Sequence, residues 1–360
     1  MRRVLHVIST LCRGGTESVV LNYFANIDKK EVMFDFLVVW GDSQNCYDDA
    51  LLAQGCHVYR MKHSPKDFIA HGKELKTFFK THKYDIVHIH AMSSLRYRVA
   101  KAAKKSGVKT VIYHSHNSNA ESHILEHKLL KTRINRWCDY KFACSDAAGK
   151  FMYKGKYSIV RNAIDLNKFV FNETFRLLLR KKYGVKGKLV VGNIGRLTKV
   201  KNQSFLISVL KILKTTNSDA VLFIVGDGEE IDNLRREVEF YELSDCVIFA
   251  GNVGSEVYKY YSMFDCFAFP SLFEGLSMVL VEAQANGLPI VASDTISLEH
   301  KIADNFVFLP IEDSVENYSK WATEILDGTE GRYSETEKLR ECGYDIKSEA
   351  KKLQDFYLGL

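Results

Sequence analysis

Two glutamates in the second half of the sequence, Glu274 and Glu282, stand eight residues apart in a pattern that can bind a charged, hydroxylated ligand. Glu274 follows an apolar run over 266–270 that predicts a β-strand, and Glu282 lies in a helical pattern over 278–286. We expect the first carboxylate on a strand-to-helix loop and the second in the helix, both facing one crevice. The helix start between them offers free backbone N–H groups, which bind anions. This combination suits a nucleotide sugar, which brings hydroxyl groups and a charged diphosphate.

A basic loop earlier in the same half could hold the diphosphate. Gly195 and Arg196 directly follow the apolar run 189–194, and Lys201 comes five residues after Arg196. Arginine presents a planar fork of donors and lysine a mobile point charge, so the two can converge on phosphate oxygens. A solvated basic loop without a ligand is the alternative.

Two glycines precede the first predicted helix. Gly14 and Gly15 follow the apolar run 4–9, and the helical pattern begins after Glu17. Glycines at a helix start let backbone amides approach an anion closely, although a plain tight turn has the same composition. The spacing is not G-x-G-x-x-G, which disfavours a nicotinamide oxidoreductase.

Histidines gather at the ends of two predicted strands. His114 and His116 precede Asn117, and His88 and His90 end the strand before. A neutral histidine in a cleft can hydrogen-bond a sugar hydroxyl or carry a proton. Because alternate residues of a strand share a face, either pair could join a site or pack in the core. Zinc is a competitor, but neither pair has a third ligand nearby in the sequence.

The elements that must position these residues are short strands separated by helical patterns. The expected strands cover 4–9, 34–40, 57–61, 86–90, 110–116, 141–145, 189–194, 220–225, 246–251, 266–270, 289–293 and 306–309. Several are apolar without alternation, as strands covered on both faces are. This is typical of parallel sheets in doubly wound α/β domains, which bind ligands beyond the carboxyl ends of their strands.

The length of 360 residues suggests two such domains. The first pattern ends near 162–165, a connecting helix is expected over 171–183, and we place the boundary between residues 170 and 171. The last segment, 346–358, reads as an amphipathic helix.

Composition is that of an ordinary globular protein, but its charge is uneven. Residues 1–170 carry 28 Lys and Arg against 15 Asp and Glu, a net +13, and residues 171–360 carry 22 against 29, a net −7. A basic half suits an anionic partner: a phosphorylated lipid, a membrane surface or nucleic acid.

Two basic, partly apolar helical patterns could lie at a membrane interface. Their basic residues are Arg96, Arg98, Lys101, Lys104, Lys105 and Lys109, then Lys128, Lys131, Arg133 and Arg136.

The eight cysteines show no C-x-x-C and no Cys/His ligand spacing. This predicts free thiols in a reducing cytosol rather than disulfides or a zinc site. No run approaches the roughly 18 apolar residues of a membrane span, and the N-terminal run is too short for a signal peptide. We expect a cytoplasmic protein that can lie on a membrane.

The whole pattern from Glu274 to Glu282 and on into Ala-Asn-Gly-Leu-Pro resembles the Glu-x7-Glu signature of retaining glycosyltransferases with the GT-B fold, in particular glycosyltransferase family 4. The Gly-Arg-Leu…Lys-Asn motif over 195–202 and the Gly-Gly-x-Glu loop over 14–17 are similar to motifs of that family. Asn-Ala-Ile-Asp over 162–165 departs from the family's Asn-Gly-Ile-Asp by its alanine.

The resemblance implies two Rossmann-like domains facing a central cleft. Residues 1–170 would bind the acceptor, residues 171–345 would bind the nucleotide-sugar donor, and the final helix, 346–360, would pack back on the first domain. The residues implied as catalytic are Glu274, His116, Arg196 and Lys201. The implied donor-binding residues are Gly14, Gly15, Arg196, Lys201, Gly226, Glu274, Gly275, Leu276, Ser277 and Glu282. On the acceptor side the resemblance implies Glu17, His114 and Asn117, with His114 second to His116 for the catalytic position.

No Asp-x-Asp pair occurs in the chain, whereas metal-dependent sugar transferases of the other main fold use such a pair on Mg²⁺ or Mn²⁺. We therefore expect no metal and no cofactor. Arg196, Lys201 and a helix start would replace the cation, and the acceptor hydroxyl would attack beside the leaving phosphate.

The sequence is interpreted as a retaining, metal-independent glycosyltransferase of polysaccharide biosynthesis, such as that of a capsule or exopolysaccharide. It would move a hexose from a nucleotide sugar, first of all a UDP-sugar, to a polysaccharide or lipid-linked oligosaccharide. It would act in the cytoplasm, with peripheral contact to an anionic membrane at the inner face of the plasma membrane and no nucleic-acid partner. Two alternatives stay open. A nucleotide-sugar epimerase on the same fold would need no acceptor. A non-catalytic sugar-nucleotide-binding subunit would be expected to have lost Glu274, Arg196 or Lys201, and all three are present.

Overall fold

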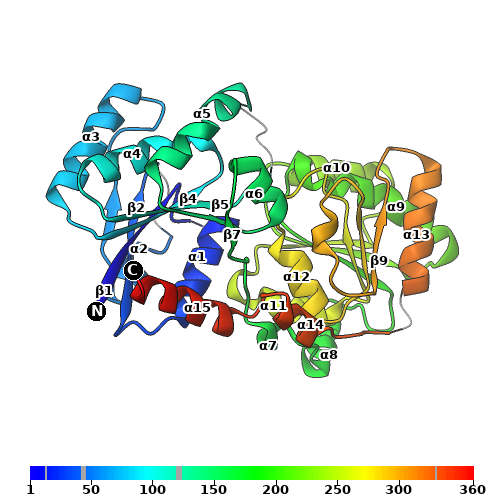
Figure 1. Ribbon diagram of the computed structural model, residues 1–360. Coiled ribbons are helices and arrows are strands. Elements are labelled where there is room, and N and C mark those ends of the chain that lie inside the picture. Colours follow the sequence, from blue (N-terminus) through cyan, green and yellow to red (C-terminus); the bar gives the residue numbers. More distant parts are fainter. Residues whose placement is uncertain (13, 42–45, 119–123, 329–330) are drawn as a thin grey trace. The chain divides into compact units, whose positions relative to one another are not determined.

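The computed structural model describes residues 1–12, 14–41, 46–118, 124–328 and 331–360. The chain divides into two compact units, one made of Met1–Ile164 and Gly343–Leu360 and the other of Asp165–Cys342. Each unit is a parallel sheet flanked by helices, the α/β architecture that the alternating pattern predicts (Figure 1).

Unit 1 holds a seven-stranded sheet in the order β3-β2-β1-β4-β5-β6-β7, and all its strand pairs are parallel. Its strands are β1 Arg2–Ile8, β2 Val32–Val38, β3 Val58–Arg60, β4 Ile86–Ala91, β5 Thr110–Ser115, β6 Tyr140–Ala143 and β7 Ser158–Ile159. All seven residues of β2 are buried, as expected of a strand covered on both faces. The two-residue β7 was not predicted, because it is an exposed edge without an apolar run.

The helices of unit 1 connect these strands. They are α1 Gly15–Asn26, α2 Asp48–Leu52, α3 Phe68–Thr81, η1 Ser94–Arg96, α4 Tyr97–Lys105, α5 Ile124–Trp137, α6 Asp146–Met152 and α15 Ile346–Leu358. Side-chain caps fix where several of them begin: the Ala70 N–H donates to Asp67 at 3.0 Å, and the Ala148 N–H donates to Ser145 at 3.1 Å.

The C-terminal helix α15 belongs to unit 1 and packs on α1 (Figure 1). The Asp28 N–H donates to the Gln354 side chain at 2.7 Å, and Tyr357 is fully buried. The final helix therefore contributes core residues to the first sheet, whose own helices are far earlier in the sequence.

Unit 2 holds a six-stranded parallel sheet in the order β10-β9-β8-β11-β12-β13. Its strands are β8 Val190–Ile194, β9 Val221–Val225, β10 Val247–Gly251, β11 Cys266–Phe269, β12 Ile290–Ser293 and β13 Phe306–Leu309. Its helices are α7 Leu166–Phe169, α8 Glu173–Lys182, η2 Lys199–Lys201, α9 Gln203–Thr216, α10 Ile231–Phe240, η3 Gly254–Glu256, α11 Val257–Met263, α12 Met278–Ala285, η4 Leu298–His300, α13 Val315–Asp327 and α14 Thr336–Glu341. Phe205 of α9 and Trp321 of α13 pack over Leu222 and Ile224 of β9 in its core.

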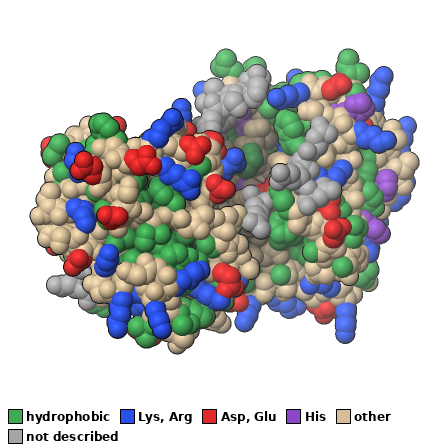
Figure 2. Space-filling model, turned by 180° about the vertical axis from the view of Figure 1, so that it is seen from behind, with side chains coloured by type: hydrophobic (Ala, Val, Ile, Leu, Met, Phe, Trp, Pro, Cys, Tyr) green, Lys and Arg blue, Asp and Glu red, His purple; other side chains and the backbone are tan. Residues whose placement is uncertain are grey.

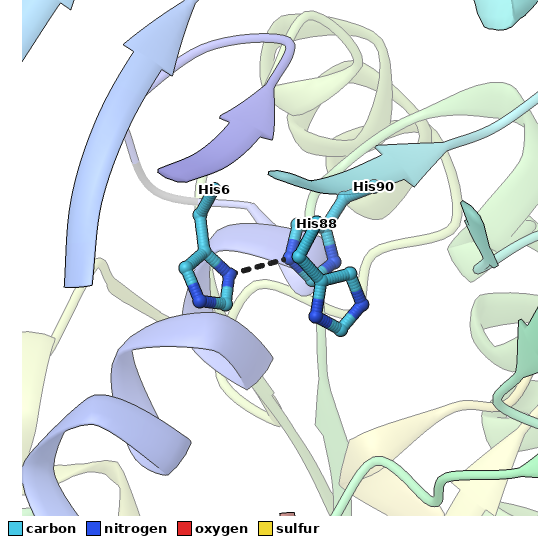
Figure 3. A group of neighbouring side chains, drawn as sticks. All are labelled: His6, His88 and His90. Atoms are coloured by element: carbon cyan, nitrogen blue, oxygen red, sulfur yellow. Dashed lines mark hydrogen bonds between the residues drawn. The ribbon is translucent and has the colours of Figure 1, made fainter. Parts of the chain in front are cut away.

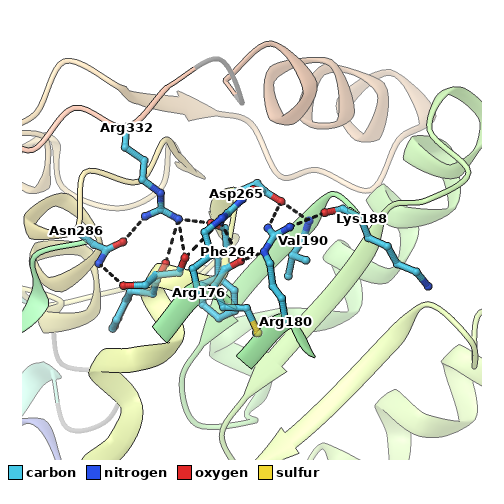
Figure 4. Close-up of polar contacts among 11 residues, drawn as sticks. Arg176, Arg180, Lys188, Val190, Phe264, Asp265, Asn286 and Arg332 are labelled. Carbon is cyan, nitrogen blue, oxygen red and sulfur yellow. Dashed lines mark hydrogen bonds and ion pairs between the residues drawn. The ribbon is translucent and has the colours of Figure 1, made fainter. Parts of the chain in front are cut away.

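A polar network holds the start of β11, the strand that leads to Glu274 (Figure 4). Asp265 accepts from Arg176 and Arg180 at 2.5 Å each, and the backbone N–H of Val190 donates to the same carboxylate at 2.8 Å. Arg332 donates to the side chain of Asn286 and to the Phe264 carbonyl. Its Nη2 also donates to the Ser262 carbonyl at 3.2 Å, and burial lowers the pKa of Arg332 to about 9.

The cysteine prediction was wrong in one respect. Cys12 and Cys46 form a disulfide with a Cα–Cα distance of 5.0 Å, and six cysteines are free. Cys12 follows β1 and Cys46 follows β2, and these strands are neighbours in the sheet, so residues 34 positions apart meet. No helix among the described residues has both the length and the apolar composition needed to cross a membrane.

Candidate active site

In unit 2 the structure joins two of the predicted catalytic residues. Lys201 in η2 forms an ion pair with Glu274 in the loop after β11, and both side chains are mostly buried, with exposed fractions of 21% and 13%. β8 and β11 are sheet neighbours, so the loops at their carboxyl ends lie side by side. The Leu272 N–H donates to the Val200 carbonyl at 2.8 Å and ties the two loops together.

Arg196 lies apart from that ion pair. Its side chain is 75% exposed, and its guanidinium is 3.4 Å from the Glu229 carboxylate. An exposed pair of this kind is weak and readily exchanged for a ligand phosphate. Arg196 is therefore available to an anion without the loss of a buried contact.

Gly226, which the resemblance implies as a donor-binding residue, has a packing role that the sequence did not predict. Its φ is +138°, and a Cβ there would stand 1.8 Å from the Gly195 carbonyl oxygen. The Gly195 N–H in turn donates to the Val225 carbonyl at 3.0 Å. Gly226 thus lets the loop after β9 pack against the loop that carries Arg196.

The residues after Glu274 lead into α12. Gly275 is half-buried, Leu276 is buried, and the Ser277 N–H donates to Nε2 of buried His300 at 3.0 Å. Burial lowers the pKa of His300, which keeps the ring neutral and able to accept this bond. His300 was missed by the sequence reasoning, because a single histidine in a different loop carries no motif.

Glu282 occupies a buried position in α12. It is 9% exposed, and Tyr261 Oη donates to its carboxylate at 2.5 Å. Burial raises the pKa of Glu282 to about 7, against the smaller opposite effects of the Tyr261 hydrogen bond and Lys168. Each glutamate of the predicted pair therefore has its own partner, Lys201 for Glu274 and Tyr261 for Glu282.

In unit 1 the glycine loop and Glu17 form one local structure. Glu17 is buried, accepts from Thr10 Oγ1 at 2.7 Å, and folds over Gly14, whose Cβ would lie 2.3 Å from the Glu17 carboxylate. Gly14 is needed to make room for Glu17. A Cβ on Gly15 would meet no atom, so Gly15 leaves open space at the start of α1.

Arg96 is a candidate site residue that the sequence reasoning misplaced among surface basic residues. It ends η1, directly after β4, and its Nη2 donates to Ser9 Oγ at 2.5 Å. Burial lowers the pKa of Arg96 to about 10, while Tyr113 and Glu17 act in the opposite direction. One feature of the sequence could have identified Arg96 as a site residue: it lies after a predicted strand and before the helical pattern begins.

His116 and His114 differ in their surroundings. His116 lies just beyond β5 and is 7% exposed, with Nε2 at 2.9 Å from Nδ1 of His90. His114 is 2% exposed inside β5, and its Nδ1 is 3.2 Å from Nε2 of His88. Asn117 is half-buried, and its backbone carbonyl accepts from Ser115 Oγ at 3.3 Å. Of the two rings, His116 lies at the carboxyl edge, where ligands bind, and His114 in the core.

The sheet also supplies the third histidine that the sequence reasoning did not find. Two groups, His6 with His88 and His90, and His90 with His114 and His116, have nitrogens within 4.8 Å of one another. Imidazoles in such groups have the ligand type of a zinc site. In the structure these ring nitrogens are hydrogen-bonded to one another in pairs.

Comparison with known proteins agrees with both units. Residues 176–345 match the family model of "Glycosyl transferases group 1", and residues 24–147 match that of "Glycosyl transferase 4-like". The protein named "Putative glycosyltransferase EpsF" of Bacillus subtilis is 29% identical over 99% of this chain and 96% of its own. A second relative, "UDP-Gal:alpha-D-GlcNAc-diphosphoundecaprenol alpha-1,3-galactosyltransferase" of Escherichia coli, is 28% identical over 61% of this chain and 60% of its own.

Solved structures share the fold. HepE of Anabaena, solved in complex with UDP, superposes with a TM-score of 0.80 over 100% of both chains at 18% identity. WaaG, a glycosyltransferase involved in lipopolysaccharide biosynthesis, superposes with a TM-score of 0.73 over 98% of this chain and 99% of its own, at 15% identity. The fold is therefore GT-B, and with the matched family models it defines the protein as a glycosyltransferase. Residues 176–345 are thus similar to group 1 glycosyl transferases, and residues 24–147 to the glycosyl transferases described as 4-like.

Proposed function

We propose that this enzyme is a retaining, metal-independent hexosyltransferase that uses a UDP-sugar and acts on a lipid-linked oligosaccharide or polysaccharide precursor. The observation that carries the proposal is the Lys201–Glu274 ion pair at the carboxyl edge of the second sheet. A lysine and a carboxylate held together here can bind the diphosphate and the sugar hydroxyls of one donor molecule.

In this mechanism the leaving diphosphate is stabilised by Lys201 and Arg196. Lys201 is preorganised by Glu274, and Arg196 exchanges its exposed partner Glu229 for phosphate oxygens. Fixed positive charge is most effective where negative charge develops in the transition state. The acceptor hydroxyl would attack from the same side as the departing phosphate, which retains the anomeric configuration.

UDP is favoured as the donor nucleotide by the relatives. HepE was solved with UDP-glucose, and the E. coli relative is named for UDP-Gal. A Mycobacterium tuberculosis relative, 24% identical over 91% of this chain and 89% of its own, is named as GDP-mannose-dependent. GDP-sugars are therefore the competing donors that a test must include.

A lipid-linked acceptor fits one surface of unit 1. Leu125 and Leu129, one helical turn apart on α5, are 71% and 75% exposed, and Lys128 is exposed between them. Arg133 stacks over Tyr97 of the neighbouring α4 at 5.5 Å. Apolar side chains flanked by lysine and arginine suit an anionic membrane surface, such as the inner face of the plasma membrane. On the face shown in Figure 2, Lys and Arg are interspersed with Asp and Glu.

The donor is tested by thermal shift with UDP, GDP, ADP and their sugars, each with and without EDTA, because a ligand of the folded state raises the unfolding midpoint. We expect a shift with UDP-sugars that EDTA leaves unchanged. NMR of the product formed on a polyprenyl diphosphate-linked sugar should show the anomeric configuration of the donor. Release of a converted free sugar without any acceptor would identify an epimerase instead.

Membrane contact is tested by flotation with vesicles of anionic phospholipid. The double variant Leu125→Ser/Leu129→Ser should float less than the wild type. The matched control is Leu177→Ser/Leu178→Ser, which removes two leucines of similar exposure from α8 of unit 2. Equal flotation of wild type and both variants would remove the membrane surface from the proposal.

A further inference from the structure

Five histidines from three neighbouring strands lie on one face of the first sheet. They are His6 of β1, His88 and His90 of β4, His114 of β5 and His116 just beyond it. In the sheet register His6 is opposite His88, and His90 is opposite His114. All five are at most 7% exposed, and Figure 3 shows His6 beside the two β4 rings. Five buried imidazoles need a reason beyond packing, since apolar side chains would fill the same space without polar atoms to satisfy.

The ring nitrogens are connected in two separate lines. In the first, Nε2 of His116 lies 2.9 Å from Nδ1 of His90, and Nε2 of His90 lies 2.9 Å from Nδ1 of His6. In the second, Nδ1 of His114 lies 3.2 Å from Nε2 of His88, whose Nδ1 meets the Tyr357 hydroxyl at 2.5 Å. Only the first line reaches the carboxyl edge of the sheet, where it ends at His116.

The three rings of the first line must share their protons in a coordinated way. Burial lowers the pKa of His116 to about 4 and that of His6 to about 3, and it holds the pKa of His90 well below its usual value. Each ring is therefore neutral at pH 7, with one N–H and one bare nitrogen. A donor on one ring must meet a bare nitrogen on the next, so the tautomer of one ring fixes the tautomers of all three.

Two arrangements satisfy this rule. In the first, Nδ1 of His6 donates to His90, Nδ1 of His90 donates to His116, and Nδ1 of His116 carries the outermost proton. In the second, every bond is reversed, and the leftover proton lies on Nε2 of His6. Among the described residues, no group meets hydrogen-bond geometry at either of these two end nitrogens, although the Asn162 side chain lies near His116.

The surroundings favour the first arrangement. The His6 ring packs on Phe34 with ring centroids 3.8 Å apart, so a proton on its Nε2 would be an unpaired donor in an apolar core. An unprotonated Nε2 of His6 costs less free energy in this apolar core than an unpaired N–H does. At the other end, the Asn162 side chain favours protonation of His116, and a bound ligand can accept from its Nδ1.

We propose that His90 and His6 are positioning residues that hold His116 as its Nδ1–H tautomer, so that His116 presents a fixed hydrogen-bond donor to an oxygen of the bound substrate. The ligand class is a hydroxylated or carbonyl-bearing sugar substrate, and this part rests on the proposed function. His116 then serves as a neutral donor and does not remove a proton from the acceptor.

The tautomers are read directly by NMR of protein labelled with ¹⁵N-histidine, which distinguishes protonated from bare ring nitrogens. We expect His6, His90 and His116 all to be protonated at Nδ1 at pH 7. Protonation of His116 at Nε2 overturns the proposal. So does a stoichiometric metal ion in the purified protein, because the metal would take the bare nitrogens. This measurement needs no turnover, so its result stands even if the protein transfers no sugar.

Turnover tests the positioning role through matched variants. His90→Phe should lower kcat roughly 10- to 100-fold, as expected for a misplaced catalytic group, and leave the thermal shift by UDP-sugar intact. His90→Asn keeps a donor near the position of Nδ1 and should recover most of that kcat. His88→Phe, an equally buried change on the same strand but in the other line, should stay within about twofold of the wild type. Normal kcat in His90→Phe, or an equal loss in His88→Phe, contradicts the inference.

Discussion

Lys201 and Glu274 form an ion pair across 73 residues of sequence, because the strands that precede them are neighbours in the second sheet. Phe269 is the last residue of β11, and Lys201 Nζ lies 4.9 Å from the centre of its ring. The ammonium group is thus held between a carboxylate and an aromatic face. It is oriented before any ligand arrives, which is what electrostatic stabilisation of a leaving phosphate requires.

Replacing Lys201 with alanine should therefore lower kcat by about 100- to 1,000-fold, the usual effect of removing one preorganised electrostatic contact. Initial rates with a saturating UDP-sugar measure it. Lys199→Ala is the matched control, because Lys199 lies in the same η2 turn but is exposed. A comparable loss in both variants would show that general loop charge matters and that the ion pair does not.

Glu274→Gln keeps the size of the side chain and removes its charge. We expect a loss of kcat similar to that of Lys201→Ala, with an unfolding midpoint close to that of the wild type. The double variant should be little worse than either single variant, since residues that act as a unit are not additive. Losses that multiply in the double variant would mean that the two residues act independently.

Much of this site could be predicted from local sequence, because each loop follows a strand that its apolar run identifies. Each expected strand is present with ends shifted by at most two residues. What could not be predicted depends on which strands are neighbours. The ion pair needs β8 beside β11, and the Cys12–Cys46 disulfide needs β1 beside β2.

The histidine cluster illustrates the same limit. The two His-x-His pairs are visible in the sequence, but His6 is a lone histidine in an apolar run. The parallel register of β1, β4 and β5 brings all five rings to one face. Arg96 was misplaced because its one 3₁₀ turn precedes the helical pattern, so it lies at the strand end instead of on the helix surface.

Gly226→Ala should destabilise unit 2. A Cβ at Gly226 would collide with the Gly195 carbonyl, and its φ of +138° is strained for alanine. We expect a loss of about 1–3 kcal/mol in the free energy of unfolding, together with lower turnover as the Arg196 loop shifts. Gly195→Ala is the control, since a Cβ there meets only Lys201 side-chain atoms at 3.7 Å. Urea unfolding of the two variants measures the difference, and equal midpoints would refute the packing role.

The disulfide predicts a redox-dependent stability of unit 1. Closing a loop between residues 34 positions apart should stabilise the folded state by about 3–4 kcal/mol through the entropy of the unfolded chain. Thiol titration of the unfolded, unreduced protein should give six free thiols.

Cys12→Ser should lower the unfolding midpoint as much as reduction does, and reduction should then have no further effect. Cys56→Ser, in the same unit, should respond to reduction as the wild type does. Eight titratable thiols in protein purified without reductant would contradict the disulfide.

Glu282 predicts a stability that falls as the pH rises. Burial raises its pKa from about 4.5 in the unfolded chain to about 7 in the folded one, so between these values the folded protein holds a proton that the unfolded chain has released. Unfolding therefore becomes easier from pH 4.5 to pH 7 and levels off above that. The total effect is about 3 kcal/mol, at about 1.4 kcal/mol for each unit of pKa.

Glu282→Gln isolates this contribution, because the amide oxygen can still accept from Tyr261 but does not titrate. The variant should be close to the wild type in stability at pH 4.5 and more stable by about 3 kcal/mol at pH 8, as measured by urea unfolding at both values. Its affinity for UDP should fall at pH 8 if the ionised carboxylate accepts hydrogen bonds from the ribose. A stability difference that stays constant between pH 4.5 and 8 would mean that Glu282 keeps an ordinary pKa, and that water or a neighbouring cation reaches it in solution.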